Sequence, residues 1–285
     1  MVETVSIAAF ISWLGDPIED ASEETFFLFS ESLPSNNLGF IDSRAQELDL
    51  DVAGQSITLK QSPGLLNSQR DTGTTGAVLW KITPLVAAWL ASSVSALHRA
   101  GVLRANSIVV ELGCGITGLI GILVAPSISS YVLTDQTYIM KTLRENITAN
   151  ASTPGEQRRK GTRHVLARPS TVPLDWETDT PSLDGLGLQT DQMIDLVIVC
   201  DCVYNEYLIK PLVVTLEDIS RLNRDGYSTT ILIAQQLRSE TIFEQFLAAL
   251  MASFAVWRLR DEDLPENLQM GSGYAVHLAL PKPKP

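Results

Sequence analysis

Hydrophobic and polar residues along this chain follow patterns that predict strands alternating with helices. Predominantly apolar runs at residues 108–110, 194–200 and 229–234 are typical of strands that are buried on both faces of a sheet. Apolar residues at helical spacing lie between these runs and predict amphipathic helices, one of them from about residue 206 to residue 221. The chain is therefore expected to fold as an open α/β sheet covered by helices.

Alternating patterns at the two ends of the chain predict antiparallel pairs. Residues 255–259 and 274–280 are expected to pair as the closing strands, and His277 in the second of them is expected to be structural rather than catalytic. Residues 48–59 alternate apolar with polar or acidic positions around a turn at Gly54. This pattern predicts a β-hairpin that is solvated on one face.

A glycine turn follows the first buried strand. Gly113, Gly115 and Gly118 have the spacing G-x-G-x-x-G and precede an apolar segment, residues 117–125, that predicts a helix. The first glycine permits a sharp turn, the second a close approach of the backbone to a ligand, and the third tight helix–strand packing. This strand–turn–helix context favours a nucleotide-binding site over a turn that simply needs small residues, although the motif alone does not identify the nucleotide.

Asp135 ends the next predicted strand, residues 131–135, and follows Gly115 by 20 positions. In a βαβ unit such a carboxylate lies beside the glycine turn, where it accepts hydrogen bonds from both ribose hydroxyls. The other interpretation is that Asp135 caps the helix after it, and the two roles are compatible. The spacing predicts a ligand that contains adenosine.

Asp201 and Tyr204 follow the second buried strand. Ligands of open α/β sheets bind at the carboxyl ends of the strands, so both side chains are expected at the site. The alternative is that Asp201 caps the helix predicted for residues 206–221.

Trp80 stands directly before another predicted helix. Thr83 is the expected N-cap of that helix and Pro84 its first helical residue. The indole is expected either to line the ligand site or to belong to the core, and this feature alone does not separate the two.

Two segments do not fit the α/β pattern. Residues 1–45 contain a short amphipathic stretch followed by acidic residues, and are expected to be an appendage rather than part of the core. Residues 151–170 are polar and include a basic cluster, which predicts a solvated surface insertion. We divide the chain into an N-terminal extension with the hairpin, residues 1–72, and a main domain, residues 73–285.

Composition and charge limit the partners of this protein. The chain has 285 residues, 45% of them hydrophobic and 19% charged, which is ordinary for a globular protein. Its net charge of −12 disfavours nucleic acids and anionic membranes and favours a basic protein partner. No run approaches the ~18 apolar residues of a membrane span. Glu3 stands where a signal peptide is positive, so we expect a cytoplasmic protein, with the nucleus left open as an additional compartment.

The cysteines and histidines do not form a metal-binding pattern. Cys114, Cys200 and Cys202 are too few for a disulfide framework and indicate a reducing compartment. The 3 histidines are far apart in the sequence. No metal site is expected, since no cluster has the spacing of zinc ligands.

Several motifs, taken in their order along the chain, resemble a known family. They are Thr75-Gly76-Ala77-Val78-Leu79-Trp80, the segment 111–119 (Glu-Leu-Gly-Cys-Gly-Ile-Thr-Gly-Leu), Leu174-Asp175-Trp176, and Asp201-Cys202-Val203-Tyr204. From about residue 48 to residue 280 the chain is similar to class I S-adenosylmethionine-dependent methyltransferases of methyltransferase family 16, the seven-strand protein-lysine methyltransferases. The hairpin and the late Gln235-Gln236-x-Arg238 are most similar to the fungal ribosomal lysine methyltransferase subfamily.

This resemblance implies a fold, a cofactor and a reaction. The fold is a Rossmann-like, mostly parallel seven-stranded sheet flanked by helices, with the N-terminal hairpin as an extension. The cofactor is S-adenosylmethionine, and its implied contacts are Trp80, Gly113, Cys114, Gly115, Asp135, Trp176 and Cys200. Trp176 is expected at the adenine, while Asp201 and Tyr204 lie near the transferred methyl group and the entering lysine. Asp201 is expected to orient the amine.

The resemblance also implies a substrate, which is a basic protein and specifically a large-subunit ribosomal protein. The enzyme is expected to be a monomer that does not contact nucleic acid directly. Another protein, such as an elongation factor or a chaperone-type ATPase, or a small amine is the main alternative. A nicotinamide-dependent oxidoreductase shares the glycine spacing, but no tyrosine precedes a lysine by four residues here. A cofactor-binding scaffold without catalysis is the remaining alternative.

Overall fold

The computed structural model describes residues 7–31, 39–66, 75–151 and 167–282. Its centre is a seven-stranded sheet with the strand order β5-β4-β3-β6-β7-β9-β8. Strand β9 pairs antiparallel with both of its neighbours, and the other pairings are parallel. The expected mostly parallel, Rossmann-like sheet is confirmed. The strands are β3 (Ile108–Leu112), β4 (Ser130–Asp135), β5 (Ser170–Pro173), β6 (Leu196–Cys200), β7 (Thr230–Gln236), β8 (Phe254–Arg258) and β9 (Tyr274–Pro281).

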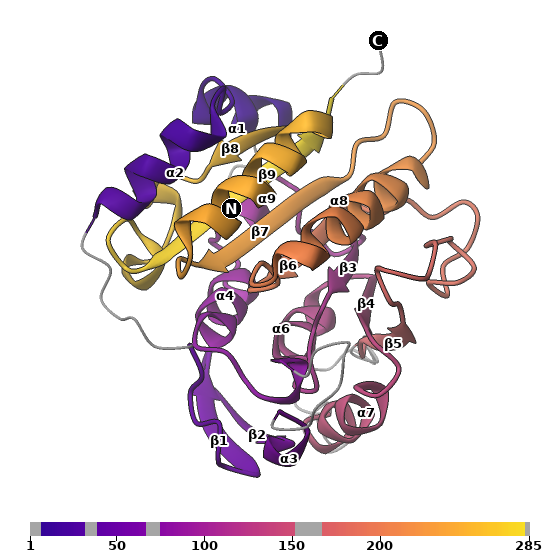
Figure 1. Ribbon diagram of the computed structural model, residues 1–285. Helices are drawn as coiled ribbons and strands as arrows, with labels where there is room; N and C mark the ends of the chain where they lie inside the picture. Colours follow the sequence, from indigo (N-terminus) through magenta and orange to yellow (C-terminus); the bar gives the residue numbers. More distant parts are fainter. Residues whose placement is uncertain (1–6, 32–38, 67–74, 152–166, 283–285) are drawn as a thin grey trace.

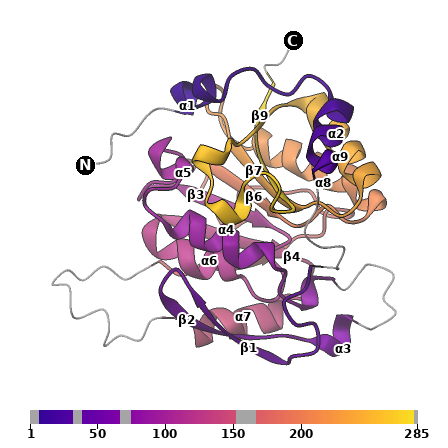
Figure 2. The same cartoon turned by 90° about the vertical axis from the view of Figure 1, so that its left-hand side faces the viewer.

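Helices cover both faces of this sheet (Figures 1 and 2). Because successive side chains of a strand point to opposite faces, β3 supplies Val109 to one core and Val110 to the other. The first core lies under α4 (Ile82–Ala91), α5 (Ala96–Arg99), α6 (Leu119–Val124) and α7 (Met140–Ala149). The second lies under α8 (Glu206–Arg221) and α9 (Glu240–Ser253). Burial on both faces explains why the central strands are continuously apolar.

The predicted hairpin is present as a separate two-stranded sheet of β1 (Glu47–Val52) and β2 (Gln55–Lys60). It is followed by the short helix α3 (Pro63–Leu66). Leu59 is buried in the first core, while Asp49 on the other face is exposed. Asn146 of α7 fastens the hairpin, since its side chain accepts a hydrogen bond from the Lys60 backbone N–H and donates one to the Ile116 carbonyl.

The N-terminal segment is built into the fold, which corrects the expectation of an appendage. Helices α1 (Ile7–Leu14) and α2 (Ala21–Ser30) contribute Phe10 and Leu28 to the two cores. The Ile18 N–H donates to the carbonyl of Val256 on the edge strand β8. His277 is buried and pairs with Glu24 of α2 at 2.9 Å, which is the structural role that its position predicted. The division of the chain at residue 72 remains a prediction.

Other boundaries differ from the sequence-based expectation. Helix α4 begins at Ile82, so Thr83 lies inside it, buried, and is not the N-cap. Helix α8 has the predicted bounds, but its N-cap is Asn205 rather than Asp201. Strand β5 begins at Ser170, within the segment predicted as an insertion. The basic part of that segment lies in residues 152–166, outside the described residues. Across the described ranges, no helix has both the length and the apolar character needed to cross a membrane.

Candidate active site

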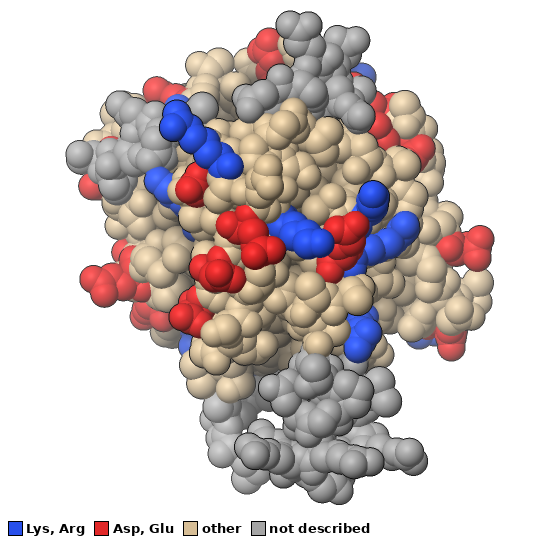
Figure 3. Space-filling view, turned by 90° about the horizontal axis from the view of Figure 1, so that it is seen from below, with Lys and Arg blue, Asp and Glu red and all other residues tan. Residues whose placement is uncertain are grey.

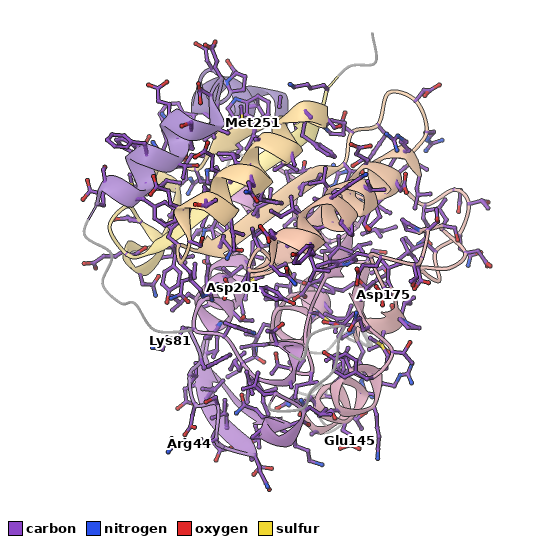
Figure 4. The ribbon with its side chains drawn as sticks, viewed as in Figure 1. Arg44, Lys81, Glu145, Asp175, Asp201 and Met251 are labelled. Carbon is purple, nitrogen blue, oxygen red and sulfur yellow. The ribbon has the colours of Figure 1, made fainter. Side chains whose placement is uncertain are left out.

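A pocket with about 830 Å³ of open space lies at the carboxyl ends of β3, β4 and β6. The order of the strands reverses between β3 and β6, and open α/β sheets bind their ligands at this kind of switch point. Figure 4 labels Asp201 and Asp175, which both line the pocket. The structure brings together every residue that the sequence placed in the site: Trp80, Gly113, Cys114, Gly115, Asp135, Trp176, Cys200, Asp201 and Tyr204.

The glycine turn forms a cradle of small residues that lines this pocket. Gly113 and Gly115 have φ angles of 66° and 64°, which L side chains rarely adopt. A Cβ atom at Gly113 would lie 2.7 Å from the sulfur of Cys202 and 3.1 Å from the ring of Trp176. A Cβ atom at Gly115 would lie 3.1 Å from the Gly76 carbonyl oxygen. Neighbouring protein atoms therefore leave no room for a side chain at either position, while both glycines line the pocket with their backbone.

Gly118 serves packing, as the spacing of the motif predicted. It precedes α6 with a φ angle of 55°. A Cβ atom there would lie 2.6 Å from Leu143 and 3.0 Å from Leu133. Its lack of a side chain lets the start of α6 sit against β4 and α7.

Asp135 lies beside the glycine turn, at the end of β4. Its carboxylate accepts hydrogen bonds from the Gly115 N–H at 2.8 Å and from the Gln136 N–H at 2.7 Å. Burial raises the pKa of Asp135 to about 6, while these two backbone donors act in the opposite direction. Each oxygen has a second lone pair left for a ligand hydroxyl. This arrangement fits the recognition of a ribose.

Glu111 is a buried acid at the floor of the pocket. The Tyr131 hydroxyl donates to its carboxylate at 2.6 Å. Burial raises the pKa of Glu111 to about 7, and the charge of Asp135 adds to this increase. The sequence contained Glu111 within the glycine motif but gave no reason to assign it to the site, since its proximity to the pocket depends on how β3 and β4 pair.

The cysteines of the site are present as thiols. Burial raises the pKa values of Cys114, Cys200 and Cys202 well above the ordinary value. The Cys200 sulfur lies 4.0 Å from the Thr83 hydroxyl, across the interface between β6 and α4. Among the described residues, no three histidine, cysteine or acidic side chains are grouped so that they could hold a metal ion.

Trp80 forms one wall of the pocket and is enclosed by two side chains from distant segments. The ring of Phe40 lies 4.5 Å from it, centroid to centroid, and the Arg238 guanidinium carbon lies 4.8 Å from its centroid. The indole N–H donates to the Thr75 carbonyl at 3.1 Å. The N-terminal segment around Phe40 thus supports a wall that the sequence had assigned to the main domain alone.

Asp201 lies at the end of β6 in a left-handed conformation, with a φ angle of 59°. One carboxylate oxygen accepts hydrogen bonds from the Gln235 amide at 3.0 Å, the Gln236 N–H at 3.2 Å and the Arg238 guanidinium at 2.8 Å. The other oxygen accepts from the second terminal nitrogen of Arg238. The side chain is 1% exposed. Three donors thus occupy one oxygen and one donor occupies the other, and the expected role of Asp201 in orienting the amine stays a prediction.

Tyr204 and Trp176 complete the pocket. Tyr204 is hydrogen-bonded to the side chain of Thr75, and burial raises the pKa of its phenol, so the hydroxyl stays protonated at neutral pH. Trp176 follows β5 and faces the glycine turn near Gly113. With Trp80, three aromatic side chains of the predicted site therefore line the pocket.

Sequence reasoning left Arg238 and Gly39 out of the site. Gly39 has a φ angle of 84°, and a Cβ atom on it would lie 2.7 Å from a terminal nitrogen of Arg238. An arginine that follows a buried strand was a visible signal. Its partner, however, lies at the end of a neighbouring strand and cannot be identified from spacing.

Charged side chains of both signs lie on the face of the molecule that is seen from below. Figure 3 shows Lys and Arg interspersed with Asp and Glu on the face seen from below. The chain has a net charge of −12, and its acidic side chains on this face are not gathered into a single patch.

Comparison with known proteins gives a family match and several relatives. The profile of a family described as "Lysine methyltransferase" matches residues 59–252. A Schizosaccharomyces pombe protein named diaminohydroxyphosphoribosylamino-pyrimidine deaminase is 31% identical, with 87% of this chain and 55% of that protein covered. Proteins named ribosomal lysine N-methyltransferase 5 are 28% identical in Candida glabrata, with 70% of each chain covered, and 26% identical in Vanderwaltozyma polyspora, with 86% of this chain and 93% of that one covered.

The chain spans about half the length of the S. pombe protein, 55% of it, so the deaminase name does not carry over. Zinc-dependent nucleobase deaminases have the signature His-x-Glu followed by Pro-Cys-x-x-Cys. Neither element occurs in this sequence.

Proposed function

Because the chain belongs to the lysine methyltransferase family, we propose that it is an S-adenosylmethionine-dependent protein-lysine N-methyltransferase that acts on a large-subunit ribosomal protein. The observation that carries this proposal is the pocket at the switch point of the sheet. It combines a glycine cradle, a carboxylate beside that cradle, and several aromatic side chains.

Residues of the chain fit the cofactor at each of its parts. The cradle at Gly113 and Gly115 takes the methionine portion, because both glycines line the pocket and present their backbone to it. Asp135 accepts the ribose hydroxyls with the lone pairs that its backbone donors leave open. We assign Trp176 to the adenine. When bound, S-adenosylmethionine supplies a methyl group on a positively charged sulfur that is ready for displacement by an amine.

The protein has to align a neutral lysine amine with that methyl group. At pH 7, deprotonating a lysine with a pKa of about 10.4 costs about 4–5 kcal/mol. Removal of the amine from water into the buried end of the pocket lowers its pKa. Tyr204 offers an aromatic face and a protonated hydroxyl at that end, and Asp201 fixes the turn that carries Tyr204. We propose no dedicated general base.

The ribosomal target is supported by the names of the relatives in C. glabrata and V. polyspora. Such a target agrees with the acidic net charge of this chain, since ribosomal proteins that bind RNA are basic. We place the enzyme in the cytoplasm, where it meets ribosomes, and expect it to act as a monomer. Another protein or a small amine remains the alternative acceptor.

The test is a labelling experiment. The purified protein is incubated with methyl-labelled S-adenosylmethionine and a cytosolic extract from cells that lack it, and labelled bands are identified by mass spectrometry. One labelled large-subunit ribosomal protein with methyl-lysine is the expected result. A Gly113→Val variant, whose side chain fills the cradle, serves as the control and should give no label.

Different outcomes identify the alternatives. Label on another protein would replace the ribosomal target and keep the reaction. Label only in the small-molecule fraction would indicate a small amine. Tight cofactor binding without any turnover would indicate a scaffold and refute the proposal.

A further inference from the structure

The Asp201–Arg238 pair joins the ends of two parallel strands beside the proposed lysine position. Asp201 follows β6 and lines the pocket, while Arg238 follows β7 and does not line it. The two terminal nitrogens of Arg238 donate hydrogen bonds to the two carboxylate oxygens of Asp201 and form a bidentate pair. The exposed fractions of the two side chains are 19% for Arg238 and 1% for Asp201. A buried charge pair of this kind needs a reason, because its desolvation is costly.

Other contacts fix the guanidinium in place. It lies over the ring of Trp80, and the oxygen of the Gln236 amide accepts from one of its terminal nitrogens at 2.9 Å. Gly39 approaches from the opposite segment so closely that an added Cβ atom would lie 2.7 Å from that nitrogen. The Nε–H of Arg238 is buried without a hydrogen-bond partner among the described residues. The guanidinium is thus clamped, although one of its donors is left unsatisfied.

An isolated carboxylate at this position would oppose methyl transfer. A negative charge near a lysine stabilises the ammonium form, which has no lone pair for attack. A positive charge of equal size on the far side of the carboxylate cancels most of this effect. The two charges are in contact, so the pocket experiences a nearly neutral pair.

We propose that Arg238 is a positioning residue that holds Asp201 in its strained turn and cancels its charge, so that the target lysine enters the site as a neutral amine. This inference rests on the proposed function. It assigns Asp201 and Arg238 to one unit, and it leaves the contact with the lysine to Tyr204 and the pocket walls.

Other titratable groups lie around this pair. Tyr274 on β9 and the thiols of Cys200 and Cys202 interact with it electrostatically. Tyr204, Glu111 on β3 and Asp135 on β4 line the same pocket as Asp201. The phenols and thiols stay protonated near neutral pH, because burial raises their pKa values. Glu111 and Asp135 have pKa values of about 7 and about 6, so they also contribute to a pH profile in this range. The experiment therefore compares variants in which both residues are unchanged.

The experiment measures the pH profile of methylation for a charge cycle of variants. Purified large ribosomal subunits from cells that lack this protein are the acceptor, with methyl-labelled S-adenosylmethionine as donor. Arg238→Gln leaves the carboxylate uncompensated, Asp201→Asn leaves the guanidinium uncompensated, and the double variant removes both charges. Arg238→Lys keeps the positive charge but cannot form the bidentate pair with Asp201.

The proposal predicts a specific pattern. Arg238→Gln moves the midpoint of kcat against pH to higher pH by about one unit and lowers the rate at pH 7 about tenfold. Asp201→Asn does not move the midpoint upward, and the double variant returns it to within about 0.3 units of wild type. Arg238→Lys keeps the wild-type midpoint at a lower kcat. Affinity for S-adenosylhomocysteine, measured by calorimetry, changes less than about threefold, because Arg238 does not line the pocket.

Two results would overturn the proposal on its own. The first is that Arg238→Gln has the same midpoint of kcat against pH as the wild-type enzyme, in an experiment where the wild-type enzyme labels the ribosomal subunits. The other is a gain in rate for Arg238→Gln, which would mean that the guanidinium occupies the place of the lysine. If Arg238→Gln does not fold, a shifted midpoint in Arg238→Lys refutes the charge role. Absence of label with the wild-type enzyme would overturn the proposed function and, with it, this inference.

Discussion

The hydroxyl of Tyr131 on β4 donates a 2.6 Å hydrogen bond to the carboxylate of Glu111 on the neighbouring strand β3. The pair is buried beneath the candidate active site, and no cation accompanies it in the contacts of the described residues. Burial raises the pKa of Glu111 from 4.5 to about 7, so the folded protein binds this proton more tightly than the unfolded chain.

This difference in pKa predicts a loss of stability as pH rises. The contribution of Glu111 is fully present below pH 4.5 and is lost as pH rises to about 7, the pKa of the folded state. Glu111→Gln removes the titration and keeps an oxygen for Tyr131. It should raise the free energy of unfolding by about 2–3 kcal/mol at pH 8 and have little effect at pH 4.5. Urea unfolding at both pH values measures this.

Glu177→Gln is the matched control, because Glu177 is exposed. It should change stability by less than about 0.5 kcal/mol at either pH. An equal effect of Glu111→Gln at pH 4.5 and pH 8 would show that the buried carboxyl does not titrate in this range.

The second prediction concerns the affinity for the cofactor and its dependence on pH. Asp135 accepts hydrogen bonds from ribose hydroxyls best when its carboxylate is ionised. Because its pKa is about 6, this carboxyl group is mostly protonated in the free protein below pH 6. Affinity for S-adenosylhomocysteine should therefore fall as pH decreases from 7.5 to 5. Asp135→Asn should weaken binding at least about tenfold at pH 7.5 and flatten this dependence, since a hydrogen bond to a charged group contributes about 1.5–3 kcal/mol.

Titration calorimetry across this pH range tests the role of Asp135. The control is Asp49→Asn on the exposed face of the hairpin, which should bind as wild type does. Retention of wild-type affinity by Asp135→Asn at pH 7.5 would remove Asp135 from the cofactor site.

Short-range sequence spacing predicted that the glycine turn and Asp135 lie together at one pocket. The glycine turn and Asp135 are linked by one βα unit, so a fixed separation in sequence gives a fixed separation in space. The carboxyl ends of β3 and β6 also brought Asp201 and Tyr204 to the pocket, as parallel strands require. The mostly parallel seven-stranded sheet was an implication of the family resemblance, and the structure confirms it.

The spacing of residues in the sequence could not predict contacts between distant segments of the chain. Arg238 neutralises Asp201 from a strand end 37 positions away, and Phe40 reaches Trp80 from the N-terminal segment. Nothing local in the sequence indicates either pairing. The capping preference of Thr83 misplaced the start of α4, because burial of Thr83 against Cys200 outweighed its tendency to cap. Whether Asp201 and Tyr204 are catalytic stays a prediction.

The third prediction concerns the N-terminal helix α2. Glu24 is partly buried between His277 and Arg258. Burial acts to raise its pKa, but the hydrogen bond and charge of His277 and the charge of Arg258 lower it overall. The contribution of Glu24 to stability is therefore present above pH 4.5 and is lost as pH falls below it.

Glu24→Gln should lower the free energy of unfolding by about 1–3 kcal/mol at pH 7, because it removes one partner of a buried charged network. Glu23→Gln is the matched control, since Glu23 is the preceding residue of the same helix and is exposed. Thermal unfolding of both variants at pH 7 measures the difference. Equal melting temperatures for the two variants would show that α2 is not held to the sheet by this network.

The last prediction tests whether the N-terminal segment supports the active site. Gly39 has a φ angle of 84°, and a Cβ atom on it would lie 2.1 Å from the Gln236 amide oxygen and 2.7 Å from Arg238. Gly39→Ala must therefore displace the groups that hold Asp201. It should cost about 1–3 kcal/mol of stability, reduce methylation, and alter the fluorescence of Trp80, over whose ring Arg238 lies.

Gly54→Ala is the control that separates the effect of backbone strain from the effect of steric overlap with neighbouring side chains. Gly54 has a φ angle of 74°, but a Cβ atom added to it would have no atom of the described residues within 4 Å, so this variant carries the strain alone. If segment 39–41 supports the guanidinium, Gly39→Ala loses methylation while Gly54→Ala keeps it, even where both lose similar stability. Equal methylation by the two variants would mean that the clamp around Arg238 adjusts to the added carbon, and that the N-terminal segment contributes to stability alone.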